Sequence, residues 1–195
     1  TDGLASLGAM AERILIETTG PLAVVGHSMG GRVALEIFAR APERVVRLAL
    51  LDTGAHGPLE SERAGRMGLV EIARTQGMGA AGRAWLPPML GAGNQTNGAL
   101  TDGILAMIER CTPEAFAAQQ EALMTRPDRM GLLKAIACPT LVATGAEDAL
   151  SSPAQNREMA ALIGGSQLAI FEGTGHMAPV ESPEAVTARL VSFLG

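Results

Sequence analysis

Residues 22–31 read Leu22-Ala23-Val24-Val25-Gly26-His27-Ser28-Met29-Gly30-Gly31. The first four form a short, continuous apolar run, which is typical of a strand buried on both faces of a sheet. Residues 26–30 match the pattern G-x-S-x-G, and the apolar residues that follow have helical spacing. A serine between a buried strand and a helix predicts a sharp turn that lifts Ser28 above the end of the sheet. The alternative is a glycine-rich turn whose serine only caps the helix.

Other apolar runs along the chain alternate with amphipathic helical patterns. Strands are expected at residues 45–51, 139–144 and 167–171, and helices at 2–17, after residue 31, from Ser152 and from Ser182. This alternation predicts an α/β protein with a mostly parallel open sheet and helices on both faces. Only helical patterns occur between about 57 and 135, so we expect residues 1–56 and 136–195 to form the core and 57–135 a helical cap.

Active sites of open parallel sheets lie at the carboxyl ends of the strands, so the candidate base for Ser28 is sought there. Histidine is the usual base at neutral pH. His27 lies inside the turn and is expected to point into packing, and His56 is more typical of a solvent-facing loop. His176 follows the last strand in a glycine-containing loop, and is therefore the best candidate.

The base needs a carboxylate that orients it. Asp148 directly follows the strand expected at 139–144, whereas Asp52, at the end of the preceding strand, is its rival. Glu147 is expected to point away from Asp148. The order Ser28, Asp148, His176 is the one found in α/β-hydrolases. In such a turn the N–H of Met29 points toward the developing oxyanion.

Composition argues against several other classes of protein. The length of 195 residues accommodates one domain with an insertion, and a net charge of −5 without a basic run argues against nucleic-acid binding. Cys111 and Cys138 are too few for a disulfide scaffold and indicate a reducing compartment. Prolines interrupt the longest uncharged stretch, 84–101, and no signal pattern is present, so a cytoplasmic protein without a membrane span is expected. No metal-binding or dinucleotide-binding spacing occurs, so we expect no cofactor.

The sequence resembles the α/β-hydrolase-fold serine hydrolases, and among them the small bacterial capped esterases and enol-lactone hydrolases. The resemblance is carried by residues 26–31, 48–52, 138–148 and 175–186. It implies that Ser28 is the nucleophile, His176 the general base and then acid, Asp148 the orienting acid, and Met29 N–H an oxyanion-hole donor. It also implies small apolar carboxylic esters or lactones as substrates, cleaved through an acyl-serine intermediate.

Several alternatives remain open at this point. An acyltransferase, a carbon–carbon bond hydrolase and a perhydrolase would use the same three side chains, and a truncated hydrolase-like module would not be catalytic. Some apolar side chains of the cap are expected to pack against the sheet.

The resemblance also implies a feature at the front of the sheet. Such hydrolases place about four further strands before the helix that leads to the serine turn, and one of them ends in a loop that donates a second oxyanion N–H. In this sequence nothing precedes the helix expected at 2–17, so the chain is expected to correspond to the C-terminal three-quarters of such an enzyme. The strand before Ser28 would then be a sheet edge, which is expected to pair with another chain or a second copy.

Overall fold

The computed structural model describes residues 3–195, whose centre is a four-stranded parallel sheet. Its strands are β1 (Leu22–His27), β2 (Val45–Leu51), β3 (Thr140–Gly145) and β4 (Gln167–Phe171). They lie side by side in chain order, each hydrogen-bonded to the next. The prediction of an α/β protein with a parallel open sheet is therefore confirmed. Because all four strands point the same way, their carboxyl ends meet at one edge.

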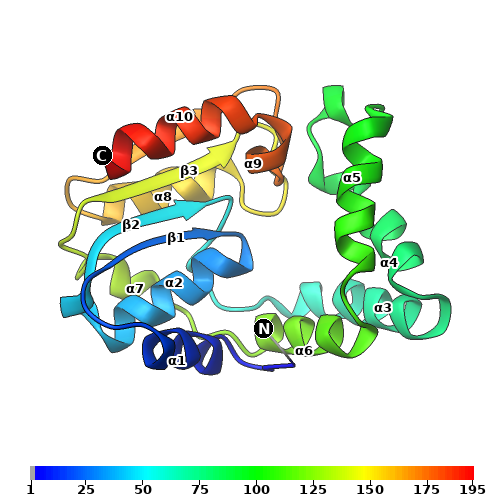
Figure 1. The fold of residues 1–195 in the computed structure, drawn as a ribbon, viewed down its shortest axis with the longest axis horizontal. Coiled ribbons are helices and arrows are strands. Elements are labelled where there is room, and N and C mark those ends of the chain that lie inside the picture. The colour runs from blue at the N-terminus through cyan, green and yellow to red at the C-terminus, as the bar shows by residue number, and fades with distance from the viewer. Residues whose placement is uncertain (1–2) are drawn as a thin grey trace.

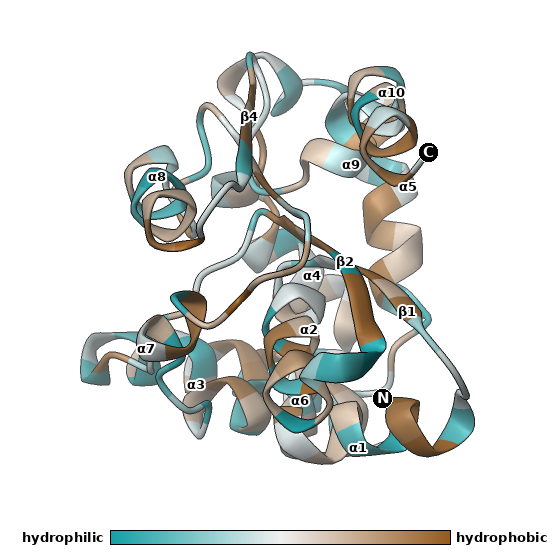
Figure 2. Cartoon of the chain, turned by 90° about the vertical axis from the view of Figure 1, so that its left-hand side faces the viewer, coloured by the Kyte–Doolittle hydropathy of each residue, from teal (hydrophilic) through white to brown (hydrophobic). Residues whose placement is uncertain are grey.

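Helices cover both faces of the sheet. One face carries α1 (Leu7–Glu17), α2 (Met29–Arg40), α7 (Met130–Leu133) and α8 (Pro153–Leu162), which pack on Leu48, Leu50 and Val142. The other face carries α10 (Pro183–Leu194), whose Phe193 packs on Ala49 and Leu141. Figure 1 shows α10 and α2 on opposite sides of the sheet, and Figure 2 shows α8 and α10 on opposite sides of β4.

Burial of β1 differs from the prediction. Ala23 is exposed and Val25 keeps 43% of its surface accessible, so this strand is not buried on both faces. Within residues 3–195 β1 pairs only with β2, as expected for a sheet edge, and α10 packs over β2 and β3 instead. The apolar run alone could not show this, because burial of a strand depends on which elements lie next to it. Pairing of this edge with another chain stays a prediction.

Helix ends largely follow the local signals. The Thr112 side chain accepts a hydrogen bond from Ala115 N at the start of α6 (Pro113–Met124), and Ser152 caps α8 in the same way. Gly77, at φ +86°, ends α3 (Glu60–Gln76). The first helix begins at Leu7, after an N-cap at Ser6, and so starts later than predicted. Residues 1–2 of the predicted helix lie outside the described residues.

Between β2 and β3 the described chain forms helices and turns but no strand. Besides α3 and α6 this part contains α4 (Met78–Trp85), α5 (Gly98–Glu109) and the 3₁₀ turns Pro87–Met89 and Ala92–Asn94. Most of its buried apolar residues form a separate cluster, against which Trp85 packs. The ring centroids of Trp85 and Phe116 lie 5.9 Å apart in an edge-to-face arrangement. No strand residue belongs to this cluster. Ala122 and Leu133, which also lie between residues 57 and 135, instead belong to the cluster that contains Leu48 of β2. The expected packing of some cap side chains against the sheet is therefore found for these two residues and not for the separate cluster. That this segment is a cap with limits at 57 and 135 stays a prediction.

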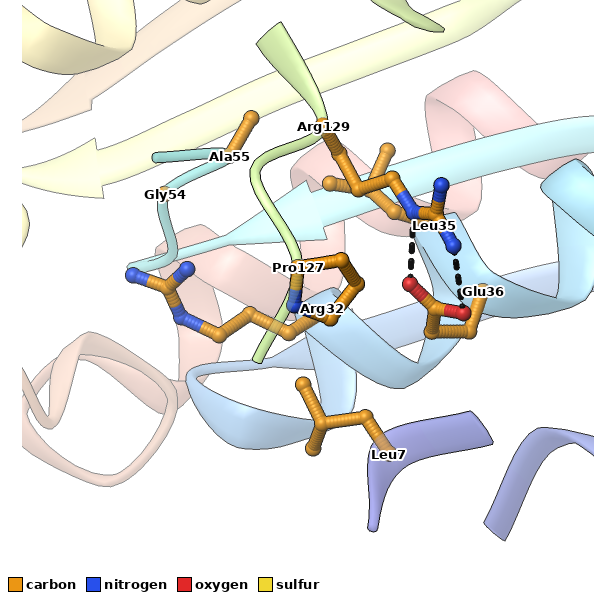
Figure 3. A pocket seen from close by; sticks show the side chains of 8 residues that line it. All are labelled: Leu7, Arg32, Leu35, Glu36, Gly54, Ala55, Pro127 and Arg129. Carbon is orange, nitrogen blue, oxygen red and sulfur yellow. Dashed lines mark hydrogen bonds and ion pairs between the residues drawn. The ribbon is translucent and has the colours of Figure 1, made fainter. Parts of the chain in front are cut away.

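An ion pair joins the end of this helical segment to the core. Glu36, on the buried side of α2, accepts hydrogen bonds from Arg129 Nε at 2.6 Å and Arg129 Nη2 at 2.9 Å (Figure 3). It is also paired with Arg40. Burial opposes ionisation of the Glu36 carboxyl, but its two arginine partners outweigh this effect and lower its pKa. The end of the helical segment between β2 and β3 is therefore fixed to α2 by a charged contact with the buried Glu36.

Replacement of Arg129 by glutamine is expected to lower the free energy of unfolding by about 2 kcal/mol at pH 7, because one of the two charges that neutralise Glu36 is lost. The lowered pKa of Glu36 stabilises the fold at pH values above the unfolded-state pKa of about 4.5. That contribution disappears as the pH falls through the lower folded-state pKa, so the difference from wild type should shrink between pH 5 and pH 3. Urea unfolding across this range measures it. Arg157→Gln, on an exposed face of α8, is the control, and an Arg129→Gln difference independent of pH would contradict the expectation.

Candidate active site

The turn between β1 and α2 holds Ser28 in a strained conformation. Its backbone has φ 52° and ψ −119°, a left-handed φ that costs a non-glycine residue about 1–3 kcal/mol. The conformation is held by hydrogen bonds from Ser28 N to Leu51 O at 2.9 Å and from Thr53 Oγ1 to Ser28 O at 2.7 Å. The Ser28 side chain makes no capping hydrogen bond to α2, so the alternative of a purely capping serine does not describe this geometry.

Two glycines around Ser28 are required by close packing, one against backbone and one against a side chain. A Cβ at Gly26 would overlap the carbonyl of Gly30, and a Cβ at Gly31 would lie 2.5 Å from Thr53 Cγ2. Both positions let the strand, the helix and the loop after β2 approach one another. Gly30 itself faces open space. The second glycine of the G-x-S-x-G pattern is therefore not needed for packing here.

The side chains of Ser28, His176 and Asp148 form one hydrogen-bonded chain. His176 Nδ1 lies 2.9 Å from Asp148 Oδ2, and His176 Nε2 lies 2.7 Å from Ser28 Oγ. A carboxylate accepts, so the proton of the neutral ring is on Nδ1, and Nε2 is left to accept from the serine hydroxyl. His176 and Asp148 are buried, whereas Ser28 is half-buried. The three residues therefore have the geometry of a nucleophile, a base and an orienting acid.

Asp148 is held as a carboxylate by its surroundings. Burial favours its neutral form, but the hydrogen bond and charge of His176 and the N–H groups of Ser151 and Leu150 outweigh burial and lower the pKa of Asp148. The two N–H groups donate to Oδ1 at 2.9 and 2.8 Å, and Thr144 Oγ1 lies 3.3 Å from Oδ2. The turn after β3 thus fixes both the charge and the direction of this side chain.

Asp52, the rival for the role of orienting acid, is placed differently. Its Oδ1 accepts from Gly145 N at 2.8 Å, and its buried Oδ2 has no hydrogen-bond partner among residues 3–195. Burial raises the pKa of Asp52 to about 8, the Gly145 N–H counteracts this effect, and the charge of Asp148 adds to it. No hydrogen bond joins Asp52 to His176 within the described chain. At neutral pH this carboxyl is protonated and is not a charged partner for the base.

The remaining candidates take other positions. The His27 ring is not simply packed, because its Nε2 donates to the backbone carbonyl of His176 at 2.8 Å. His56 is partly exposed and faces Glu158, with 3.5 Å between Nε2 and Oε2. Glu147 points away from Asp148, as expected, and accepts from Ala92 N at 2.7 Å.

One backbone N–H at the turn is free to bind an anion. Met29 is the first residue of α2, where a helix has no internal partner for its N–H groups. Within residues 3–195 no acceptor takes a hydrogen bond from Met29 N. The positive end of the helix dipole lies at the same place. This N–H is therefore suited to stabilise negative charge that develops beside Ser28 Oγ.

Three contacts of the site were not anticipated from the sequence. Thr53 fixes the backbone of Ser28, Thr144 contacts the Asp148 carboxylate, and Glu181 binds the loop of His176. Thr144 lies in the strand expected at 139–144 and Glu181 in the segment 175–186 that carries the resemblance, but neither pattern names a hydrogen-bond partner for the side chain.

The described residues offer no group of three or more histidine, cysteine or acidic side chains that could bind a metal ion. Among the helices of residues 3–195, none combines the length and the apolar character that a membrane crossing requires.

A parallel sheet whose first strand turns sharply at a strained serine into a helix, with aspartate and histidine at the ends of later strands, defines the α/β-hydrolase class. Comparison with known families agrees, since the model of the Alpha/beta hydrolase family matches residues 2–189. The chain belongs to this family.

Similar proteins include several named as esterases. Pimeloyl-[acyl-carrier protein] methyl ester esterase of Neisseria meningitidis serogroup B is 29% identical over 198 residues, which cover 96% of this chain and 74% of that protein. The structure of a thermophilic esterase from Thermogutta terrifontis has a TM-score of 0.90 and 31% identity, covering 98% of this chain and 72% of that one. The enol-lactonase from Burkholderia xenovorans LB400 has a TM-score of 0.86 and 27% identity, covering 97% and 73%.

Proposed function

We propose that this chain hydrolyses small apolar carboxylic esters or lactones through an acyl-serine intermediate. The observation that carries the proposal is the chain of hydrogen bonds from Ser28 Oγ to His176 Nε2, 2.7 Å, and from His176 Nδ1 to Asp148 Oδ2, 2.9 Å. The similarity to a thermophilic esterase and to an enol-lactonase supports ester and lactone carbonyls as the reacting groups.

In the first half of the reaction Ser28 Oγ attacks the substrate carbonyl carbon while His176 Nε2 takes the hydroxyl proton. The carbonyl oxygen becomes an oxyanion beside Met29 N–H, which is unpaired within residues 3–195. The tetrahedral intermediate collapses to the acyl-serine, and the proton on Nε2 passes to the departing alkoxide. The alcohol leaves, or, with a lactone, stays attached to the acyl group.

In the second half water attacks the acyl carbon and His176 Nε2 takes a proton from it. Collapse of the second tetrahedral intermediate releases the carboxylic acid and returns the proton to Ser28 Oγ. Asp148 keeps the Nδ1 proton in place in both halves and stabilises the imidazolium that forms between them. Its lowered pKa keeps it ionised throughout.

Charge on the cap favours a small substrate over one carried by a protein. The named Neisseria relative acts on an acyl group attached to a carrier protein. Recognition of a charged protein partner relies on a surface of opposite sign. Residues 57–135 contain eight basic and eight acidic side chains. The segment therefore has no net charge that would attract a protein partner of the opposite sign. We therefore favour a free ester or lactone.

Acyl transfer, carbon–carbon bond hydrolysis and perhydrolysis would use the same three side chains and differ in the bond cleaved or in the group that accepts the acyl carbon. Product analysis in the presence of competing alcohols and hydrogen peroxide separates them from hydrolysis. Release of the free acid as the main product is the expected result.

The proposal is tested by labelling the full chain with a fluorophosphonate, which phosphonylates activated serines, followed by peptide mass spectrometry. Label is expected on Ser28 and on no other serine, and a short ester or lactone should slow labelling by competition. Ser28→Ala should not be labelled, and Ser61→Ala, an exposed serine at the start of α3, should react like wild type. Folded wild-type protein that takes up no label would overturn the proposal and favour a non-catalytic module.

A further inference from the structure

The backbone of His176 is held from three directions. Its N–H donates to Met89 O at 2.8 Å, and its carbonyl accepts from His27 Nε2 at 2.8 Å. The N–H of Met177 donates to Glu181 Oε1 at 3.3 Å. These groups belong to the two peptide units that flank the Cα of His176, so together they set the direction in which its side chain leaves the backbone.

Glu181 ends the short helix α9 (Ala178–Glu181) and uses both of its carboxylate oxygens. Oε1 accepts from Gly175 N at 2.8 Å, in addition to Met177 N. Oε2 accepts from Gly91 N at 2.7 Å and from Asn94 Nδ2 at 2.9 Å. One carboxylate therefore joins the loop of His176 to a segment of the cap, and all four of its partners are uncharged N–H donors.

The two segments that Glu181 joins are also packed backbone against backbone. A Cβ at Gly175 would lie 2.6 Å from Met89 O, and a Cβ at Gly91 would lie 2.8 Å from Gly173 O. Met177 packs against the apolar cluster of the cap. Residues 89–94 therefore support the histidine loop, and they cannot move away without displacing His176.

We propose that Glu181 is a positioning residue, which sets the place of the His176 imidazole by holding the histidine loop and residues 89–94 together. This inference rests on the proposed function of His176 as the base. The carboxylate suits the role because its two oxygens accept four hydrogen bonds, whereas an amide of the same shape offers one accepting oxygen and places an NH₂ group against two of the donors. A displacement of the imidazole by about 1 Å is enough to lower kcat about 100-fold.

The test compares Glu181→Gln with Glu184→Gln, the same substitution at an exposed position in the first turn of α10. We expect Glu181→Gln to lower kcat for a short ester by about 10- to 100-fold with KM within about threefold of wild type, as is typical when a partner that orients a functional histidine is lost. Phosphonylation of Ser28 should slow by a similar factor. Glu184→Gln should match wild type in both assays. Glu181→Asp, which retains the charge but is one methylene shorter, should give a smaller loss.

Different outcomes separate this inference from the proposed function. If wild type is neither labelled nor active, the proposed function fails, and the positioning role fails with it. If wild type is labelled but Glu181→Gln matches it in kcat and labelling rate, only the positioning role is overturned, even if its melting temperature falls. A rise in KM at unchanged kcat also overturns it, because Glu181 would then serve substrate binding through the cap. Should Glu181→Gln not fold, Glu181→Asp is judged by the same criteria.

Discussion

Replacing Ser28 or His176 by alanine is expected to lower kcat about 10⁶-fold, and replacing both together is expected to lower it by about the same factor. The reason is that the two side chains act as one unit, joined by the 2.7 Å contact between Ser28 Oγ and His176 Nε2. Without the imidazole the hydroxyl keeps its proton and is a poor nucleophile, and without the hydroxyl the imidazole has no group to activate. Once either is lost, the second substitution removes nothing further.

Steady-state hydrolysis of a chromogenic short-chain ester by the two single variants and the double variant measures this effect. His56→Ala is the matched control, because the His56 side chain is partly exposed and its Nε2 lies 3.5 Å from Glu158 Oε2. It should retain the wild-type kcat. If the losses of the single variants multiply in the double variant, Ser28 and His176 act independently and the proposed mechanism is wrong.

The ends of two strands were predicted correctly because each depends on a local signal, whereas β1 (Leu22–His27) ends two residues and β3 (Thr140–Gly145) one residue later than predicted. Both β2 (Val45–Leu51) and β4 (Gln167–Phe171) have the predicted bounds, since in each case an apolar run ends at a polar residue or a glycine-containing loop. Parallel strands place their carboxyl ends at one edge, so Ser28, Asp148 and His176 could be expected there together. Their catalytic roles remain part of the proposal.

Features that depend on several distant segments could not be predicted in the same way. The exposure of Val25 depends on how far α10 extends across the sheet, which no local pattern encodes. The helical segment between β2 and β3 forms a separate apolar cluster, and helical periodicity gives the buried face of a helix without naming its partner. Glu181 binds backbone N–H groups of Gly91 and Gly175, and backbone groups leave no trace in a sequence.

The choice between Asp148 and Asp52 as the orienting acid leads to the second large expected effect. Asp148→Asn is expected to lower kcat about 10⁴-fold. The amide nitrogen of the introduced asparagine would donate toward His176 Nδ1, which favours the tautomer with the proton on Nε2. A protonated Nε2 faces Ser28 Oγ as a donor and cannot remove its proton. The hydrogen bonds from Leu150 and Ser151 can remain on the side-chain oxygen that is kept, so the turn should keep its shape.

Asp52→Asn is the matched comparison, and its effect on kcat at pH 7 is expected to be less than about threefold. Because burial raises the pKa of Asp52 to about 8, the wild-type carboxyl is already neutral at that pH, and an asparagine oxygen can still accept from Gly145 N.

The raised pKa of Asp52 also has a consequence for stability. Between about pH 4 and pH 8 the unfolded chain loses the Asp52 proton while the folded chain retains it, so this residue destabilises the fold increasingly as the pH rises. Asp52→Asn should remove this decrease of the free energy of unfolding with rising pH.

These two variants distinguish the candidates for the orienting acid, because Asp148→Asn is expected to change kcat and Asp52→Asn the pH dependence of stability. Kinetics at pH 7 should show a large loss for Asp148→Asn and almost none for Asp52→Asn, whereas urea unfolding from pH 5 to pH 8 should show a flatter stability profile for Asp52→Asn than for wild type. A loss of about 10⁴-fold in Asp52→Asn with an active Asp148→Asn would reverse the assignment. Comparable moderate losses of kcat in both variants would indicate that both carboxyls orient His176. That outcome would contradict the assignment, because His176 Nδ1 makes its 2.9 Å contact with Asp148 and not with Asp52.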